Sequence, residues 1–392
     1  MLKLQKYVII NSKCGVIMNV VVAIDSFKGS LSSLQAGNAV KEALIKADKA
    51  STAEVFSLAD GGEGTVEAMY EGLGGEIKEI EVTGPIFNKV KSRYLILPDK
   101  TAVIEMATAA GLNLVPENKR NPMDTTTFGV GELIKDAISS GCRNFIIGIG
   151  GSATNDGGIG MLSALGYDFR DENNETIPLC CKGLEHLYEI SARNVLPELE
   201  DCKFRIACDV NNPLCGKNGC SYIFAPQKGA SEDDIVKMDL WLKKYAEIAK
   251  TISSDADSDF PGAGAAGGLG FAFRTFTNAE LESGIDIIID AICLEDGIKN
   301  CDIVVTGEGR LDSQTVMGKA PIGVAKLAKK YGKKVIAFSG IIGNGAEVCN
   351  KHGIDAFFPI VRTITTAESA MKPDNAYKNL TDTAYQVFRL IK

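Results

Sequence analysis

The sequence predicts an α/β protein in which a doubly wound parallel sheet forms the core and a second, more antiparallel domain is inserted into it. Short apolar, β-branched runs alternate with stretches of helical periodicity near both ends of the chain, as in βαβ units. Residues 76–105 instead alternate between apolar and polar side chains and carry turn signals. The length of 392 residues leaves room for two or three domains of ordinary size.

The first elements follow a βαβα order. Residues 19–25 (NVVVAID) form a short apolar, β-branched run, which predicts a strand of a buried parallel sheet. Turn signals at Gly84-Pro85 and at residues 98–100 divide the alternating region into an antiparallel meander. The other elements expected here are a helix over 34–47, a strand over 53–60 and a helix over 62–73.

Predicted strands and helices alternate again after the meander, and this alternation is clearest in the last third of the chain. We expect helices over 125–141, 157–166, around Trp241, over 321–332 and 346–353, and at the C-terminus, and strands over 144–150, 204–210, 301–307, 333–340 and 355–360. The core domain then comprises residues 18–75, 122–165 and 295–392. The inserted domain comprises 76–121 and 166–294, and residues 1–17 form an N-terminal extension.

Charge and composition exclude several classes of function. Lys and Arg number 42 and Asp and Glu 50, for a net charge of −8, and no basic run stands out. A nucleic-acid or anionic-membrane surface is therefore not expected. No apolar run reaches 18 residues, and residues 1–17 make a poor signal peptide, so we expect a cytoplasmic protein. The eleven cysteines include no C-x-x-C pair, which indicates reduced thiols rather than disulfides or zinc.

Six loops rich in glycine, acids and hydroxyls stand out, and most of them follow a predicted strand. Glycine makes up 41 of the 392 residues. In an open α/β sheet, ligands bind outside the carboxyl ends of the strands, so these loops are the best candidates for a site. The loops are DSFKGSLS (25–32), LADGGEGT (58–65), GIGGSATNDGG (148–158), CDVNNPL (208–214), PGAGAAGGLGF (261–271) and TGEGRLD (306–312).

The first loop offers a cation and hydroxyl groups, whereas the second offers glycines and a carboxylate. Ser26, Lys28 and Ser30 stand before a predicted helix, where a cation and hydroxyls suit a phosphate or carboxylate; the alternative is a helix cap with a solvated lysine. In the second loop, Gly61 and Gly62 allow a ligand close to the backbone. The neighbouring Asp60 could hold Mg²⁺, or it could simply cap a tight turn.

The third loop is the most distinctive segment of the chain. Gly150 and Gly151 are followed by the hydroxyls of Ser152 and Thr154 and by the acid of Asp156. Successive backbone N–H groups in such a loop can cradle a phosphate. The alternative is a purely structural turn.

The last three loops indicate a ligand site less specifically than the third loop does. Asp209 and Asn211 could hold a metal or a hydroxyl, although an Asx-Pro turn explains them equally well. The fifth loop matches G-x-G-x-x-G, but no apolar strand precedes it, so Gly264 and Gly267 indicate a ligand loop or close packing rather than a dinucleotide site. The sixth loop brings Glu308, Arg310 and Asp312 together; Arg310 could hold a carboxylate or phosphate, or pair with the aspartate.

Several catalytic motifs are absent from the sequence. It contains no G-x-x-x-x-G-K-[ST] loop, no G-x-S-x-G elbow and no protein-kinase motif set. The two histidines, His186 and His352, stand alone, so a Ser-His-Asp triad is not expected.

Taken together and in this order, the six loops resemble the bacterial glycerate kinase family, and the similarity runs from about residue 18 to the C-terminus. The resemblance implies two α/β domains, one of them discontinuous and flavodoxin-like. It also implies ATP- and Mg²⁺-dependent phosphorylation of glycerate in a cleft between the domains, with 2-phosphoglycerate favoured over 3-phosphoglycerate. The chain would act on a small molecule, as a monomer or homodimer.

Phosphoryl transfer needs positioning, charge stabilisation and a carboxylate near the attacking hydroxyl. Asp209 or Asp60 is the expected base, and Lys28 and Arg310 are the expected cations for glycerate or the phosphoryl group. Mg²⁺ would be held by Asp60, Asp156 or Asp312, and the sequence does not rank base against metal ligand. The other expected contacts to substrate or phosphate are Ser26, Ser30, Gly61, Gly62, Gly150, Gly151, Ser152, Thr154, Asn211, Gly264, Gly267 and Glu308.

Three alternative functions remain open from the sequence. The closest is a kinase acting on a related small hydroxy acid. A non-catalytic sugar-acid binding protein could use the same scaffold, and it would bind glycerate without releasing ADP. An NAD-dependent oxidoreductase would depend on residues 262–267 alone.

Overall fold

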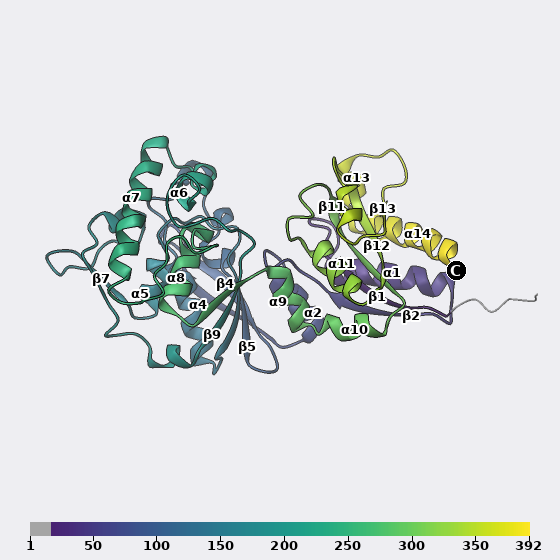
Figure 1. Cartoon of the computed structure of the whole chain (residues 1–392), viewed down its shortest axis with the longest axis horizontal. Coiled ribbons are helices and arrows are strands. Elements are labelled where there is room, and N and C mark those ends of the chain that lie inside the picture. The colour runs from purple at the N-terminus through teal and green to yellow at the C-terminus, as the bar shows by residue number, and fades with distance from the viewer. Residues whose placement is uncertain (1–16) are drawn as a thin grey trace, which may run out of the picture. The chain divides into compact units, whose positions relative to one another are not determined.

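The computed structural model describes residues 17–392, which form two compact units (Figure 1). Unit 1 takes its described residues from 17–56, 296–313 and 325–392. Unit 2 comprises residues 57–295 and 314–324. Each unit has its own sheet, and each is described separately below.

Unit 1 is built on a five-stranded sheet in the order β13-β12-β11-β1-β2. The pairs β1–β11, β11–β12 and β12–β13 are parallel. In chain order this arrangement is 2-1-3-4-5, the flavodoxin-like order, which confirms the predicted fold class. The strands are β1 (Asn19–Ile24), β2 (Thr52–Ser57), β11 (Ile303–Leu311), β12 (Lys334–Ile342) and β13 (Ala356–Pro359).

Two long helices, α1 (Ser33–Ala47) and α14 (Pro373–Ile391), pack against each other in unit 1. The α1 helix begins where it does because Ser32 and Gln35 form a capping box, in which each side chain accepts a hydrogen bond from the other residue's backbone N–H. Their apolar faces join β1 in one hydrophobic core. The other helices that lie wholly or partly in this unit are α10 (Leu294–Asn300), α11 (Ala320–Lys330), α12 (Val348–Lys351) and α13 (Ala367–Met371).

Unit 2 is built on a six-stranded mixed sheet in the order β10-β9-β6-β5-β4-β3. The pairs β3–β4 and β4–β5 are antiparallel, as predicted for the meander, and the remaining neighbours are parallel. The strands are β3 (Glu76–Thr83), β4 (Lys89–Ile96), β5 (Thr101–Glu105), β6 (Asn144–Gly148), β9 (Lys203–Ala207) and β10 (Ala279–Glu282). A separate antiparallel ribbon joins β7 (Asp168–Arg170) to β8 (Glu189–Ser191).

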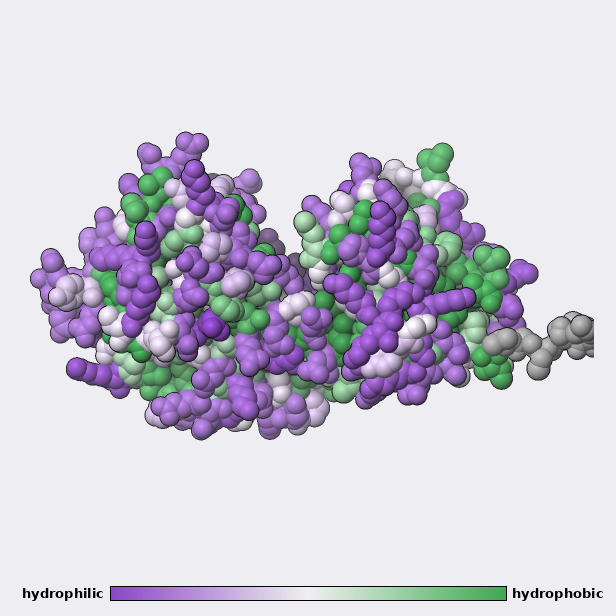
Figure 2. Space-filling view, viewed as in Figure 1, coloured by the Kyte–Doolittle hydropathy of each residue, from purple (hydrophilic) through white to green (hydrophobic). Residues whose placement is uncertain are grey.

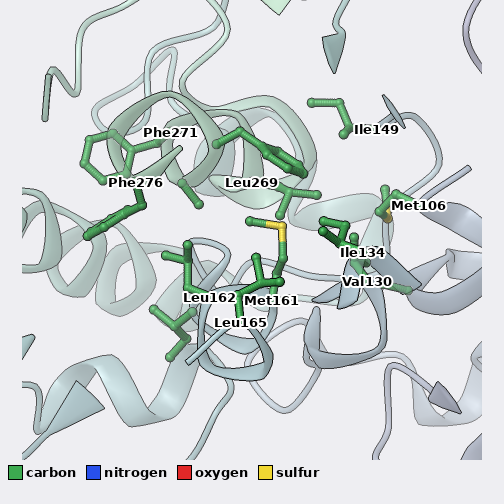
Figure 3. Close-up of a cluster of buried hydrophobic side chains, with 14 of the residues drawn as sticks. Met106, Val130, Ile134, Ile149, Met161, Leu162, Leu165, Leu269, Phe271 and Phe276 are labelled. Atoms are coloured by element: carbon green, nitrogen blue, oxygen red, sulfur yellow. The ribbon is translucent and has the colours of Figure 1, made fainter. Parts of the chain in front are cut away.

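The core of unit 2 is formed by helices that pack on this sheet, and Figure 3 shows part of it. Val130 and Ile134 of α4 lie near Met161 and Leu162 of α5, and all four side chains are fully buried. The helices are α2 (Thr65–Leu73), α3 (Ala107–Ala110), α4 (Phe128–Ser139), α5 (Ile159–Ala164), α6 (Cys220–Phe224), α7 (Glu232–Ala249), α8 (Leu269–Phe276) and α9 (Gly284–Ala291). Short 3₁₀ turns lie at Leu112–Leu114, Glu117–Lys119, Cys181–Glu185, Pro197–Asp201, Pro226–Lys228 and Ala265–Gly267.

The two units differ from the expected domain boundaries. Residues 57–75, 122–165 and 314–324 were expected in the core domain, but they belong to unit 2. The reason is that β6 lies between β5 and β9, so the segment around it joins the mixed sheet. A short apolar strand has the same sequence pattern whichever parallel sheet it enters.

The surface gives no sign of a membrane-spanning segment in the part of the chain from residue 17 onward. No helix there is both long and apolar enough to cross a bilayer. The face in Figure 2 is mostly hydrophilic, with small apolar areas between the polar side chains.

Candidate active site

Four of the six loops meet in unit 2, where β6 and β9 end side by side. Gly148 and Ala207 are the last residues of these strands and are register partners. The loop that carries Gly61 crosses this edge: a Cβ atom on Gly61 would lie 2.6 Å from Ala207 Cβ, and one on Gly148 would lie 2.1 Å from Gly61 O. Only glycine permits such close approach of the backbones.

The glycines of the fifth loop pack against the third and fourth loops, while Ala265 and Ala266 of the same loop line the cavity described below. Gly264 N donates to Asn212 O at 2.9 Å, and Gly157 N donates to Gly267 O at 2.9 Å. A Cβ atom on Gly267 would lie 2.1 Å from Thr154 O. Neither Gly264 nor Gly267 lines the cavity described below. Their positions therefore fit the alternative considered for this loop, close packing of the backbone, rather than contact with a substrate.

A cavity of about 420 Å³ opens at the edge where these loops meet. Such a volume lies within the range of small-molecule sites. Seven residues expected in the site line it: Asp60, Gly61, Gly62, Gly150, Gly151, Ser152 and Asp209. Phe224, Gln227 and Lys228, which the sequence did not single out, complete one side.

Asp209 is open to this cavity and is oriented by the start of α9. Its Oδ1 accepts a hydrogen bond of 3.0 Å from Gly284 N. Partial desolvation of the carboxylate by the surrounding protein raises its pKa. The hydrogen bond from Gly284 acts in the opposite direction, and the negative charge of Asp60 raises the pKa further.

Asp60 faces the same cavity, and its Oδ1 accepts a hydrogen bond of 3.0 Å from Gly62 N. Two carboxylates on one cavity suit Mg²⁺, which proteins commonly hold through one or two carboxylates together with substrate phosphates. A cation would also relieve the repulsion that Asp209 experiences from Asp60. Residues 17–392 contain no group of three or more metal-ligating side chains, so the remaining ligands would come from substrate and water.

Asp156, expected as a metal ligand, has a different environment. It is fully buried, and its carboxylate accepts hydrogen bonds from the N–H and hydroxyl of Thr127, both at 2.8 Å, and from the N–H groups of Gly158 and Gly160. Four donors leave little room for a cation, so the expected metal role does not fit this geometry. The carboxylate instead ties the third loop to the start of α4.

Two further expected contacts lie away from the cavity. Thr154 is fully buried behind the loop, and its hydroxyl contributes nothing to the cavity wall. Asn211 is exposed and does not line the cavity, and Val210 is the last residue of that loop to do so. The expected contacts of these two residues with substrate in this cavity are therefore not supported.

Lys228 is the clearest functional candidate that the sequence did not reveal. Its side chain is almost completely buried, and its Nζ donates to Ser152 Oγ at 2.8 Å and to Thr154 O at 2.7 Å. Burial lowers its pKa to about 8. A single lysine in a Pro-Gln-Lys-Gly turn carries no local signal of burial, since its contacts lie more than 70 residues earlier in the chain.

The first loop and the segment expected as the sixth loop meet in unit 1, where β1 ends. Most of that segment is strand rather than loop, because β11 continues to Leu311 instead of ending at residue 307 as predicted. Asp25 N donates to Gly307 O at 2.9 Å and joins the two segments. The strand order of this sheet reverses between β1 and β11, which is the switch point where open α/β sheets bind ligands. Ser26, Lys28 and Ser30 follow β1 and Asp312 follows β11, whereas Glu308 and Arg310 lie within the last residues of β11 itself.

The groups at the switch point of unit 1 differ in exposure. Lys28 is exposed, whereas Glu308 is nearly buried. Arg310 Nε donates to Asp312 Oδ2 at 2.9 Å, which is the internal ion pair considered as the alternative for this loop. The hydroxyl of Ser30 is buried and has no hydrogen-bond partner in the described part of the chain. An oxygen atom of a ligand could accept the hydrogen bond that this hydroxyl can donate.

Comparison with known proteins gives a consistent result over most of the chain. The glycerate kinase family profile matches residues 20–392. A glycerate 2-kinase from Escherichia coli (strain K12) is 48% identical over 364 residues, which cover 93% of this chain and 95% of that protein. A glycerate kinase from Bacillus subtilis (strain 168) is 43% identical, covering 93% and 96%. A crystal structure assigned as glycerate kinase 2 from Salmonella typhimurium LT2 has a TM-score of 0.88 and 44% identity, covering 96% of this chain and 98% of that one.

Proposed function

The chain belongs to the glycerate kinase family, and from that premise we propose that it transfers the γ-phosphoryl group of ATP to a hydroxyl of glycerate, forming 2-phosphoglycerate. The observation that carries the proposal is the cavity of unit 2, where two carboxylates and a glycine-rich loop face one small space. Phosphoryl transfer requires little more than such positioned groups. The glycerate 2-kinase from Escherichia coli supports the choice of the 2-hydroxyl.

Asp209 is the group we assign as the base. The hydrogen bond from Gly284 N fixes the carboxylate orientation, and a raised pKa makes the ionised form a stronger proton acceptor. Asp209 would accept the hydroxyl proton of glycerate as the oxygen attacks the phosphorus atom. The geometry thus favours Asp209 over Asp60, which the sequence had not ranked.

Asp60 is the residue we assign to the cation. Mg²⁺ bound there would neutralise negative charge on the phosphates of ATP. The Asp60 carboxylate is held by Gly62 N, so it presents its oxygens without rearrangement of the loop. Asp312 is a weaker candidate because Arg310 already occupies one of its oxygens.

The test is ADP release from ATP and Mg²⁺ with D-glycerate, followed by identification of the product by phosphorus NMR. We expect a glycerate-dependent rate and a single resonance for 2-phosphoglycerate. A 3-phosphoglycerate resonance would overturn the regiochemistry alone. ADP release only with another small hydroxy acid would favour the related kinase, and ATP-independent glycerate binding without ADP would favour a binding protein.

A further inference from the structure

Lys228 lines the cavity of unit 2, but the phosphoryl transfer proposed above gives it no role. We propose that Lys228, together with the backbone N–H groups of residues 150–152, binds an oxyanion of the reactants. The oxyanion is either the carboxylate of glycerate or a phosphoryl group of ATP. The inference rests on the proposed function, because that function supplies both anions.

The charge of Lys228 is the first line of support. Only 2% of the residue is exposed, and lysines are almost never buried to that extent without a partner of opposite charge. Within residues 17–392, no carboxylate lies within ion-pair distance of its Nζ. The ammonium group is therefore desolvated without an ionic partner in the protein, a cost that an anionic ligand would offset.

The hydrogen bonds of Lys228 are the second line of support. An ammonium group has three N–H donors. Two of them reach neutral oxygens, Ser152 Oγ and Thr154 O, and these contacts fix the position of Nζ. The third donor remains for a ligand in the cavity that Lys228 lines.

The loop beside Lys228 is the third line of support. Leu112 N donates to Gly151 O, and Ala153 N donates to Ala110 O, so the loop is fixed through its flanking groups. Over the described range 17–392, the N–H groups of Gly150, Gly151 and Ser152 reach no protein acceptor. Three N–H groups and a buried ammonium on one cavity form a built site for an oxyanion.

The other ionisable groups near Lys228 do not replace such a ligand. Asp156 acts on Lys228 through space, but four other donors already hold its carboxylate. Burial raises the pKa of the Cys220 thiol to about 12, so it is neutral at physiological pH. Asp60 and Asp209 line the same cavity and add negative charge, which makes a fixed cation more valuable when a further anion enters.

The experiment is calorimetric titration of the full chain and of its Lys228→Met variant with D-glycerate alone, with inorganic phosphate alone and with ATP. Methionine keeps the unbranched stem of the side chain and removes the ammonium group with its charge. We expect the variant to lose affinity by about 10- to 100-fold for the anion that Lys228 binds, as for loss of a charged hydrogen bond. Loss for glycerate alone identifies the carboxylate; loss for phosphate and ATP alone identifies the phosphoryl group. Lys237→Met, at an exposed position of α7, is the matched control and should bind as the parent does.

The pH dependence separates a binding role from a structural one. Because burial lowers the pKa of free Lys228 to about 8, an anion that raises it again must be bound together with a proton. Affinity should therefore fall above pH 8 in the parent chain, and this pH dependence should vanish in Lys228→Met. A structural lysine would change the thermal midpoint of the unliganded protein instead.

Two results overturn the inference. The first is a folded Lys228→Met variant that binds all three ligands within twofold of the parent. The second is a loss of affinity that is fully explained by unfolding. If the parent releases glycerate-dependent ADP while either result is obtained, only the role of Lys228 fails; if the parent releases none, the proposed function itself fails.

Discussion

The two loop clusters of this chain contain similar residue types but are held in different ways. In unit 2, the groups at the ends of β6 and β9 are fixed by backbone contacts so close that glycine is required at Gly61 and Gly148. Two buried polar side chains, Asp156 and Lys228, hydrogen-bond to backbone groups of the third loop. In unit 1, the loop after β1 and the last residues of β11 present exposed side chains such as Lys28 and Arg310.

The difference predicts how each cluster responds to substitution. Where polar groups are buried and mutually hydrogen-bonded, removing one affects stability together with activity. Where a charged side chain is exposed, its removal leaves the fold almost unchanged. Comparing activity with stability in matched variants therefore tests whether the two clusters are organised as described.

The largest expected effect is that of Asp209→Asn in unit 2. The amide oxygen can still accept the hydrogen bond from Gly284 N, so the fold should persist while the proton acceptor is lost. We expect kcat to fall by about 10²- to 10⁴-fold, with the KM for glycerate within about threefold. Steady-state ADP release measures both constants, and Asp233→Asn on the exposed side of α7 is the control. A kcat within threefold of the parent would exclude Asp209 as the base.

The acid side of the pH profile tests the same residue without a substitution. A base must be ionised to act, so kcat/KM should decline as the pH falls through the pKa of Asp209. Since desolvation and the charge of Asp60 raise that pKa, the decline should begin above the ordinary range of an aspartate. In the chain without Mg²⁺, replacing Asp60 with Asn removes one of the two causes and should lower the pKa of Asp209, which NMR titration of its carboxylate measures. An unchanged pKa of Asp209 in that variant would contradict the coupling.

The second effect in size is the destabilisation caused by Asp156→Asn. The side-chain NH₂ group would meet the N–H groups of Thr127 or Gly158, which need an acceptor. We expect the free energy of unfolding of unit 2 to fall by about 2–4 kcal/mol, the cost of breaking a buried network. Scanning calorimetry measures the loss. A variant with unchanged stability and a raised requirement for Mg²⁺ would restore Asp156 as a metal ligand.

The sequence predicted most of the strands, though not β7, β8 or β10, and seven residues of the cavity wall, because these features are local. A run such as residues 19–24 is apolar wherever it folds, and Asp60 and Asp209 stand at the carboxyl ends of predicted strands. Which sheet β6 joins depends on partners far along the chain, and that information is not contained in its five residues. Lys228 was missed for the same reason, since its burial arises from the distant loop of Ser152.

The fifth loop shows that glycines can be required for a reason other than ligand binding. Gly264 and Gly267 are required where they stand, but the atoms that exclude a side chain there are backbone atoms of Pro213 and Thr154. Sequence alone cannot separate close approach to a ligand from close approach to another loop, because both require the same missing Cβ.

The third expected effect tests the cluster of unit 1 through Lys28→Ala. Because Lys28 is exposed at the end of β1, its loss should change the free energy of unfolding by less than about 0.5 kcal/mol. If it contacts a reactant at the switch point, the KM for ATP or glycerate should rise about tenfold, as for the loss of a charged hydrogen bond. Kinetics with each substrate varied in turn would identify which one. Lys41→Ala, exposed on α1, is the control, and equal kinetics in both variants would remove Lys28 from the site.

The smallest expected effect is the loss of oxyanion affinity caused by Ser152→Ala. This variant tests whether Ser152 in unit 2 acts on the ligand directly or through Lys228. The substitution removes one of the two oxygens that position the Lys228 ammonium and leaves only Thr154 O. The charged form of Lys228 then becomes less favourable, so its pKa should fall below about 8 and oxyanion affinity should weaken about threefold, the value of one ordinary hydrogen bond. Titration across the pH range measures both changes, with Ser139→Ala at an exposed position of α4 as the control. If affinity weakens without a shift of the pH dependence, Ser152 contacts the ligand directly and does not act through Lys228.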